Sequence, residues 1–139
     1  MKYLNIQKCR ECEFKKLPSS LEVLIIGYDV KFKKFPKLPD SLKTFVFRTF
    51  EEKDKQIELP KNLKELNLGE SFNQKLDKLP STLEVLIVGN SFKYNLPTLP
   101  QSLKTLNLRD YTYPLRDLSY LVNLEKLSIS ILVILSVII

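Results

Sequence analysis

The 139-residue chain contains no histidine and no tryptophan, only three glycines and only two cysteines. Without histidine it lacks the commonest general base and the commonest protein ligand for metal ions. Two cysteines cannot build a disulfide framework or complete a tetrahedral zinc site. The remaining residues show no paired acid and base or nucleophile motif. We therefore predict that the protein is not an enzyme, and that it uses no metal and no cofactor.

What the chain does contain fits one globular domain. Hydrophobic residues make up 44% of it and charged residues 27%, and 22 Lys and Arg against 16 Asp and Glu leave a net charge of +6. These are ordinary values for a folded domain that is modestly basic. The segment from Met1 to Ile6 lacks the basic head and apolar run of a signal peptide. We expect an intracellular, cytoplasmic protein.

A repeated motif organises the chain. The pattern L-P-x-x-L-x-x-L-x-L begins at Leu17 and returns along the sequence, and a sixth copy that starts at Leu118 keeps the leucines but drops the proline. A lead leucine follows the proline of each motif copy by three residues, and successive lead leucines are 20 or 21 residues apart. This step is typical of leucine-rich repeats. The lead leucines are Leu21, Leu42, Leu63, Leu83, Leu103 and Leu124.

The spacing within the motif predicts the fold. The last two apolar positions are two residues apart, so they point to the same side of a β-strand. One strand per repeat cannot bury its apolar side alone, but stacked repeats form a parallel sheet with a continuous core. Proline cannot donate within a central strand, so we place it where the chain turns back toward the sheet. We predict an α/β-class leucine-rich-repeat solenoid over residues 1–130, mostly β, with about seven parallel strands and few or no helices.

The outward side chains of these strands form the concave sheet face, which is the usual binding surface of such solenoids. Its aliphatic residues should form two patches, one on the second and third strands and one on the fifth. Exposed apolar patches often mark contact sites, although β-branched residues also suit any strand. Two arginines just past the strand ends suit a carboxylate or a phosphate, or are simply solvated. The predicted partner-binding residues are Val23, Ile25, Val46, Arg48, Val85, Ile87, Asn107 and Arg109.

Two charge patterns accompany the repeat. The residue after each lead leucine is charged, and Glu22 beside Lys43 and Lys104 beside Glu125 should form opposite-charge neighbours between strands. Lysines gather in the other half of the repeats, on the convex side, where a basic strip would suit nucleic acid or a membrane surface. Interleaved acidic residues favour a solvated mixed surface instead. The lysines of this strip are Lys31, Lys33, Lys34, Lys37, Lys53, Lys55, Lys75, Lys78 and Lys93.

Two short segments lie outside these patterns. Cys9 stands where leucine-rich repeats carry a buried asparagine or cysteine, so we expect it in the core, and nothing near Cys12 suggests metal binding or redox chemistry. The apolar tail, residues 131–139, is far shorter than the ~20 residues of a membrane-spanning helix. We expect it to cover the open end of the solenoid as a cap strand. Self-association through this tail and truncation of a longer protein are the alternatives.

The segments after two of the strands carry a family resemblance. Gly69 to Leu76 reads G-E-S-F-N-Q-K-L, Gly89 to Leu96 reads G-N-S-F-K-Y-N-L, and each leads into a Leu-Pro pair. This resembles the FNIP repeat, a leucine-rich-repeat variant that is named for a Phe-Asn-Ile-Pro stretch and is typical of social amoebae and their giant viruses. The resemblance spans roughly residues 17–117. Asn73 matches the asparagine of the motif, whereas Lys93 departs from it.

The resemblance implies contacts with other proteins. Some FNIP proteins carry an F-box that recruits a ubiquitin-ligase core, but here a strand is already predicted from Tyr3 to Gln7, so the chain is a bare repeat module or a fragment. We predict a non-enzymatic scaffold that binds a protein partner on the concave sheet face, with substrate recognition as one such role. Binding of nucleic acid or a membrane through the basic strip is the alternative, and a purely structural element of a longer chain is another.

Overall fold

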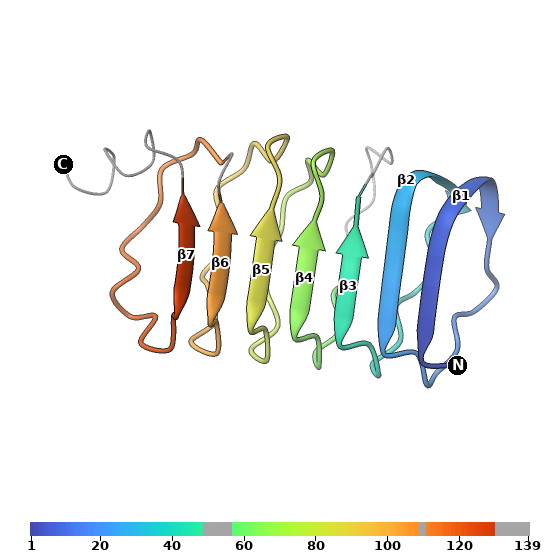
Figure 1. Ribbon diagram of the computed structural model, residues 1–139, viewed down its shortest axis with the longest axis horizontal. Coiled ribbons are helices and arrows are strands. Elements are labelled where there is room, and N and C mark those ends of the chain that lie inside the picture. Colours follow the sequence, from blue (N-terminus) through green and yellow to red (C-terminus); the bar gives the residue numbers. More distant parts are fainter. Residues whose placement is uncertain (49–56, 109–110, 130–139) are drawn as a thin grey trace.

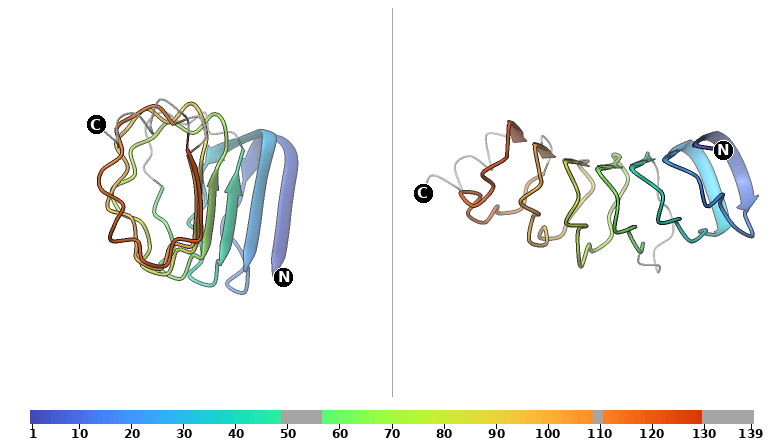
Figure 2. Two further views of the ribbon diagram at one scale, coloured as in Figure 1. Left: turned by 60° about the vertical axis from the view of Figure 1, so that its left-hand side comes forward. Right: turned by 90° about the horizontal axis from the view of Figure 1, so that it is seen from below.

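The computed structural model describes residues 1–48, 57–108 and 111–129. They form a coil in which each turn adds one strand to a single sheet, and loops close the turn behind the sheet (Figure 1, Figure 2). None of the described residues is helical. The predicted solenoid of about seven parallel strands with few or no helices is confirmed. The strands are β1 (Tyr3–Glu13), β2 (Val23–Lys34), β3 (Thr44–Phe47), β4 (Glu65–Leu68), β5 (Val85–Val88), β6 (Thr105–Leu108) and β7 (Lys126–Ile129).

The strands follow one another in chain order from β1 to β7, and every neighbouring pair is parallel. The register is the same from β2 onward, so equivalent residues of successive repeats lie side by side. One such row is Leu24, Phe45, Leu66, Leu86, Leu106 and Leu127. Because side chains alternate along a strand, the whole row points to one side of the sheet. The leucine spacing in the sequence thereby builds a continuous apolar wall.

A second row of apolar residues fills the coil behind this wall. Phe45 and Leu66 on the sheet are 0% exposed. Behind them the Phe72 ring stacks on the Phe92 ring at 6.0 Å between centroids, and Phe92 lies 6.1 Å from Tyr111 in the next turn. Stacked aromatic rings bury a large area and add attraction beyond that burial. The aromatic residues after β4, β5 and β6 thus continue the core from turn to turn.

Each Leu-Pro pair opens a tight turn that leads the chain back into the sheet. The lead leucine N–H donates to the proline carbonyl three residues earlier, as from Leu42 to Pro39 at 3.1 Å. The residue before each lead leucine is Ser, Thr or Asn, and it bonds to the preceding turn. Ser41 Oγ donates to the Leu21 carbonyl at 2.6 Å, and Thr82 Oγ1 donates to the Leu63 carbonyl at 2.8 Å. This ladder was not predicted from the sequence, although the hydroxyl or amide residue repeated before each lead leucine was its signal.

The two ends of the coil depart from the regular repeat. β1 and β2 have 11 and 12 residues, against 4 in each of β3 to β7, and their pairing contains register shifts between Ile6 and Glu13. The first strand therefore extends beyond the predicted end at Gln7. At the other end, Leu127 of β7 is 45% exposed although it belongs to the inward row. The predicted capping tail, residues 131–139, lies outside the described residues.

Candidate interaction surface

The strand side chains that point away from the core form one broad surface, which we call the sheet face. Figure 2 shows that the sheet behind it curves only gently along the coil. Val23 and Ile25 of β2 lie in register with Thr44 and Val46 of β3, and all four side chains are half-buried. The structure thus brings Val23, Ile25 and Val46 together as one aliphatic patch. Their role in binding stays a prediction.

The second predicted patch is separated from the first by a polar strand. Val85 and Ile87 are half-buried on β5, and β4 places Glu65 and Asn67 beside them in register. On the far side, Asn107 of β6 lies in register with Ile87. The sheet face is therefore two aliphatic areas divided by a carboxylate and an amide, a division that suits a partner with matching polar groups.

Of the two predicted arginines, only Arg48 can be placed. It is exposed just beyond β3, and its guanidinium carbon lies 5.4 Å from the ring centroid of Tyr28. A cation above an aromatic face is attracted by the ring, so Tyr28 orients Arg48 at the edge of the sheet face. Tyr28 itself is 55% exposed. Arg109 lies outside the described residues.

The charged residues just before the strands form ion pairs between turns, as predicted for Glu22 and Lys43. The Glu22 carboxylate lies 3.1 Å from Lys43 Nζ and also 3.1 Å from Lys2 Nζ. Hydrogen bonds from Lys43 and then Lys2, with the attraction of their charges, lower the pKa of Glu22. These pairs are exposed, so each adds little to stability and mainly favours the observed register.

A second such cluster lies further along the sheet. The Glu84 carboxylate is 2.8 Å from Lys104 Nζ and 3.1 Å from Lys64 Nζ. Hydrogen bonds from Lys104 and then Lys64 lower the pKa of Glu84, and the bond to Glu84 raises the pKa of Lys104. Lys104 makes its close pair with Glu84, and the predicted neighbour Glu125 adds only a weaker attraction. Glu84 is the stronger partner of Lys104 because its carboxylate lies within hydrogen-bond distance of Lys104 Nζ.

The lysines of the predicted basic strip are distributed over different parts of the fold. Lys31, Lys33 and Lys34 belong to β2, where Lys33 Nζ lies 3.4 Å from Glu11 in β1. Lys75, in the loops behind the sheet, lies 3.7 Å from Asp77. β2 continues to Lys34, where the later repeats have no strand, and Figure 2 shows it running from the sheet toward the side of the loops. A basic strip on the convex side stays a prediction. Lys53 and Lys55 of the same predicted strip lie outside the described residues.

The cysteine prediction also needs correction. Cys12, not Cys9, is the fully buried cysteine, with 4% exposure, while Cys9 is half-buried. The two residues form a disulfide with their Cα atoms 5.6 Å apart. The cause lies in β1, where the register shift between Cys9 and Cys12 turns the second cysteine inward. The intracellular location stays a prediction.

Residues 1–48, 57–108 and 111–129 contain neither a metal-binding cluster nor a membrane-spanning helix. No group of three or more Cys, Asp or Glu side chains is placed to hold a metal ion there. Nor does that part of the chain contain a helix long and apolar enough to span a membrane.

The parallel sheet, the repeated register and the Leu-Pro turns define a leucine-rich-repeat solenoid. The model of one family, the FNIP Repeat, matches residues 54–91 and 72–111 of the sequence. These matches include β4 to β6 and the stacked rings of Phe72 and Phe92. Residues 54–111 of the chain therefore carry FNIP repeats. Comparisons with curated proteins and with solved structures found no match.

Proposed function

We propose that this chain is a non-enzymatic scaffold that binds a partner protein through the sheet face. The observation that carries this proposal is the aliphatic patch of Val23, Ile25 and Val46, which points away from the core and is half-buried in the isolated chain. Each such side chain contributes about 1.5–3 kcal/mol when a partner removes it fully from water. Because these side chains are already half-buried, a partner that covers the patch would gain the part of this free energy that belongs to the area still exposed.

The residues around the patch support the same function. Tyr3 lies in register with Val23 and is 55% exposed. The Arg48 guanidinium lies over the Tyr28 ring, just beyond the carboxyl end of β3. Tyrosine and arginine are the side chains most enriched at the energetic centres of protein interfaces. An aliphatic patch bordered by exposed tyrosines and an oriented arginine is therefore suited to a protein surface.

A scaffold without catalysis agrees with the composition and the family. The chain has no histidine, and repeat solenoids mainly offer long surfaces for contact. In this proposal, one form of the scaffold role is to recognise substrates on behalf of another protein assembly. Binding of an anionic partner through the lysines is the alternative, and it differs in its strong dependence on salt.

The test is a pull-down from host lysate at low and moderate salt with wild type, Val46→Asp and Val122→Asp. Val122 is 79% exposed in the turn before β7, away from the sheet face, so it is a matched valine-to-aspartate control. Circular dichroism checks that both variants fold. We expect Val46→Asp to weaken capture of a specific protein about tenfold or more, because a charge would be buried without a partner, and Val122→Asp to leave it unchanged.

Two outcomes would contradict the proposal. Equal capture by Val46→Asp and wild type would exclude the patch around Val46 as the contact. Capture that follows nucleic acid or lipid and disappears at moderate salt would indicate that the lysines form the functional surface.

A further inference from the structure

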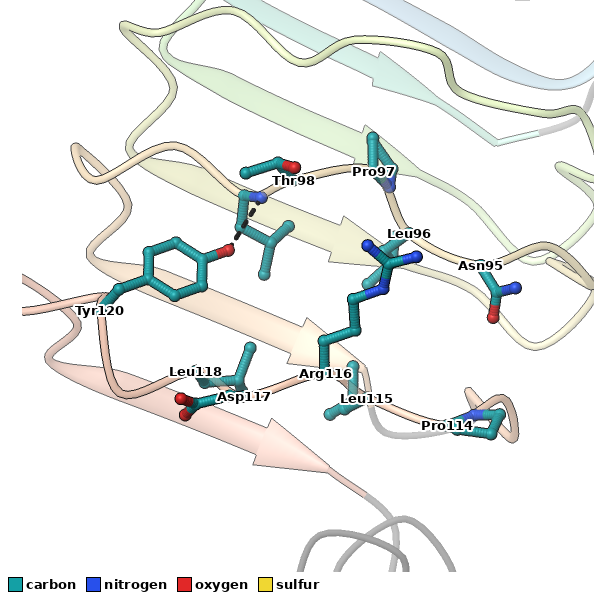
Figure 3. A pocket seen from close by; sticks show the side chains of 11 residues that line it. Asn95, Leu96, Pro97, Thr98, Pro114, Leu115, Arg116, Asp117, Leu118 and Tyr120 are labelled. Atoms are coloured by element: carbon teal, nitrogen blue, oxygen red, sulfur yellow. Dashed lines mark hydrogen bonds between the residues drawn. The ribbon is translucent and has the colours of Figure 1, made fainter.

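A pocket of about 260 Å³ lies between the last two turns of the coil, in the loops behind the sheet (Figure 3). Residues 95–99 form one wall and residues 114–118 form the other. Tyr120 closes one end, where its hydroxyl oxygen accepts a hydrogen bond from the Leu99 N–H at 3.1 Å. The pocket is separate from the sheet face and from the charge clusters beside it.

The pocket has a cause in the sequence. The equivalent turn bonds from Leu103 to Pro100 and from Leu124 to Leu121 align Leu99 of the fifth repeat with Tyr120 of the sixth and not with Leu118. Leu96 and Leu99 are therefore three residues apart, whereas Leu115 and Tyr120 are five apart. The sixth repeat also has Leu121 where the fifth has Pro100. The loop of the sixth repeat therefore holds two additional residues beside the pocket. The added length opens the space between the walls.

The walls are apolar and one charge crosses the opening. Leu96, Leu99, Leu115 and Leu118 contribute side chains to the lining. Figure 3 shows Arg116 extending from its own loop across toward the opposite wall. Within the described residues Arg116 makes no ion pair, so its guanidinium is available at the edge of the pocket.

The neighbouring carboxylate does not neutralise Arg116. Asp117 Oδ1 accepts a hydrogen bond from the Ser119 N–H at 2.8 Å, and Oδ2 accepts one from Ser119 Oγ at 2.8 Å. Figure 3 shows its carboxylate turned away from Arg116. The hydrogen bonds from Ser119, that of the backbone first, lower the pKa of Asp117. The charge that faces the opening is therefore positive.

We propose that this pocket binds a peptide segment of a partner protein in which a bulky apolar side chain lies next to a carboxylate. The volume is below the ~300–1,000 Å³ of pockets for whole small molecules, and it suits one large side chain. The leucines would enclose that side chain, and Arg116 would bind the carboxylate through its paired N–H groups. The carboxylate belongs to an adjacent acidic residue or to the carboxyl terminus of the peptide.

The test follows backbone amide shifts of the full ¹⁵N-labelled chain while short peptides are added. The probes are acetyl-Gly-Phe-Glu-Gly-amide, the same peptide with Gln for Glu, the same with Ala for Phe, and acetyl-Gly-Gly-Phe with a free carboxyl terminus. We expect saturable shifts at Leu96, Thr98 and Leu118 with a peptide that carries both Phe and a carboxylate. The Gln and Ala peptides should bind about tenfold more weakly.

Arg116→Gln should weaken the binding of the carboxylate peptides by the same factor and leave the binding of the Gln peptide unchanged. Arg10→Gln is the matched control, because Arg10 is an exposed arginine on β1 at the other end of the sheet. Binding of only one of the two carboxylate peptides would identify the source of the carboxylate. Absence of saturable shifts at the pocket, or equal affinity of the Glu and Gln peptides, would overturn the proposal. Val46→Asp leaves this pocket intact, so the result is independent of the proposed role of the sheet face.

Discussion

The middle turns of the coil and its last turn are built from the same motif but pack differently. In β4 and β5, Leu66 and Leu86 are 0% exposed, whereas Leu127, their counterpart in β7, is 45% exposed. A repeat buries its apolar side against its neighbours, and the middle strands have a described neighbour on each side. The motif alone therefore does not determine burial; the position of a repeat within the stack does.

The second difference between these regions is loop length. Turns whose Leu-Pro loops keep the same length stack with their leucines enclosed, and the longer loop of the last turn leaves a pocket beside Leu115 and Leu118. The hydrogen bonds between turns persist in both regions, since Asn123 Nδ2 still donates to the Gln101 carbonyl at 2.9 Å. This hydrogen bond between turns thus tolerates a change in loop length that side-chain packing does not.

The largest expected effect tests the packing difference directly. Leu86→Ala in the enclosed core should lower the free energy of unfolding by about 3–5 kcal/mol, because it leaves a cavity. Leu115→Ala beside the existing pocket should cost only about 1–2 kcal/mol, because its side chain is half-buried and little new void is created. Urea denaturation followed by circular dichroism gives both values. Equal losses would mean that the last turn is packed as tightly as the middle.

A smaller effect is expected from the hydrogen-bond ladder. Thr82 Oγ1 contacts two carbonyl oxygens, of Lys61 at 2.9 Å and Leu63 at 2.8 Å, the second partly buried. Thr82→Ala should cost about 1–2 kcal/mol, since it leaves a carbonyl poorly satisfied, and Asn123→Ala in the exposed last turn about 0.5 kcal/mol. The same denaturation experiment compares them. A larger loss for Asn123→Ala would reverse the ranking of the two regions.

The smallest effect is confined to acid. The pKa of Glu84 in the folded chain is below its ordinary value of 4.5 because Lys104 and Lys64 favour the carboxylate. The contribution of this group is therefore fully present above about pH 4.5 and is lost as the pH falls through the lowered pKa. Glu84→Gln should lose less stability than wild type between pH 6 and pH 3. The check is to measure the midpoint of urea unfolding for both proteins at several pH values across this range. An identical change of the midpoint with pH in the two proteins would contradict the assignment.

Local spacing in the sequence was enough to predict the strands and the sheet face. The leucine period placed the strands, and alternation placed Val23, Ile25 and Val46 together on the outside. The pairing of Lys104 with Glu84 was not predictable, because Lys104 has a carboxylate neighbour on each side, Glu84 and Glu125, and only side-chain reach selects between them. The inward turn of Cys12 depends on register shifts in β1, which the short repeat does not encode.

The sequence by itself determined the repeat length, the parallel register and which side of each strand is buried. Those properties follow from periodicity, since each turn must match the next to bury its leucines. Only the tertiary structure decided how far β1 and β2 extend, where Arg48 rests and where the pocket beside Arg116 opens. These depend on distances between neighbouring turns, and a change of two residues in one loop alters such distances without disturbing the strand pattern.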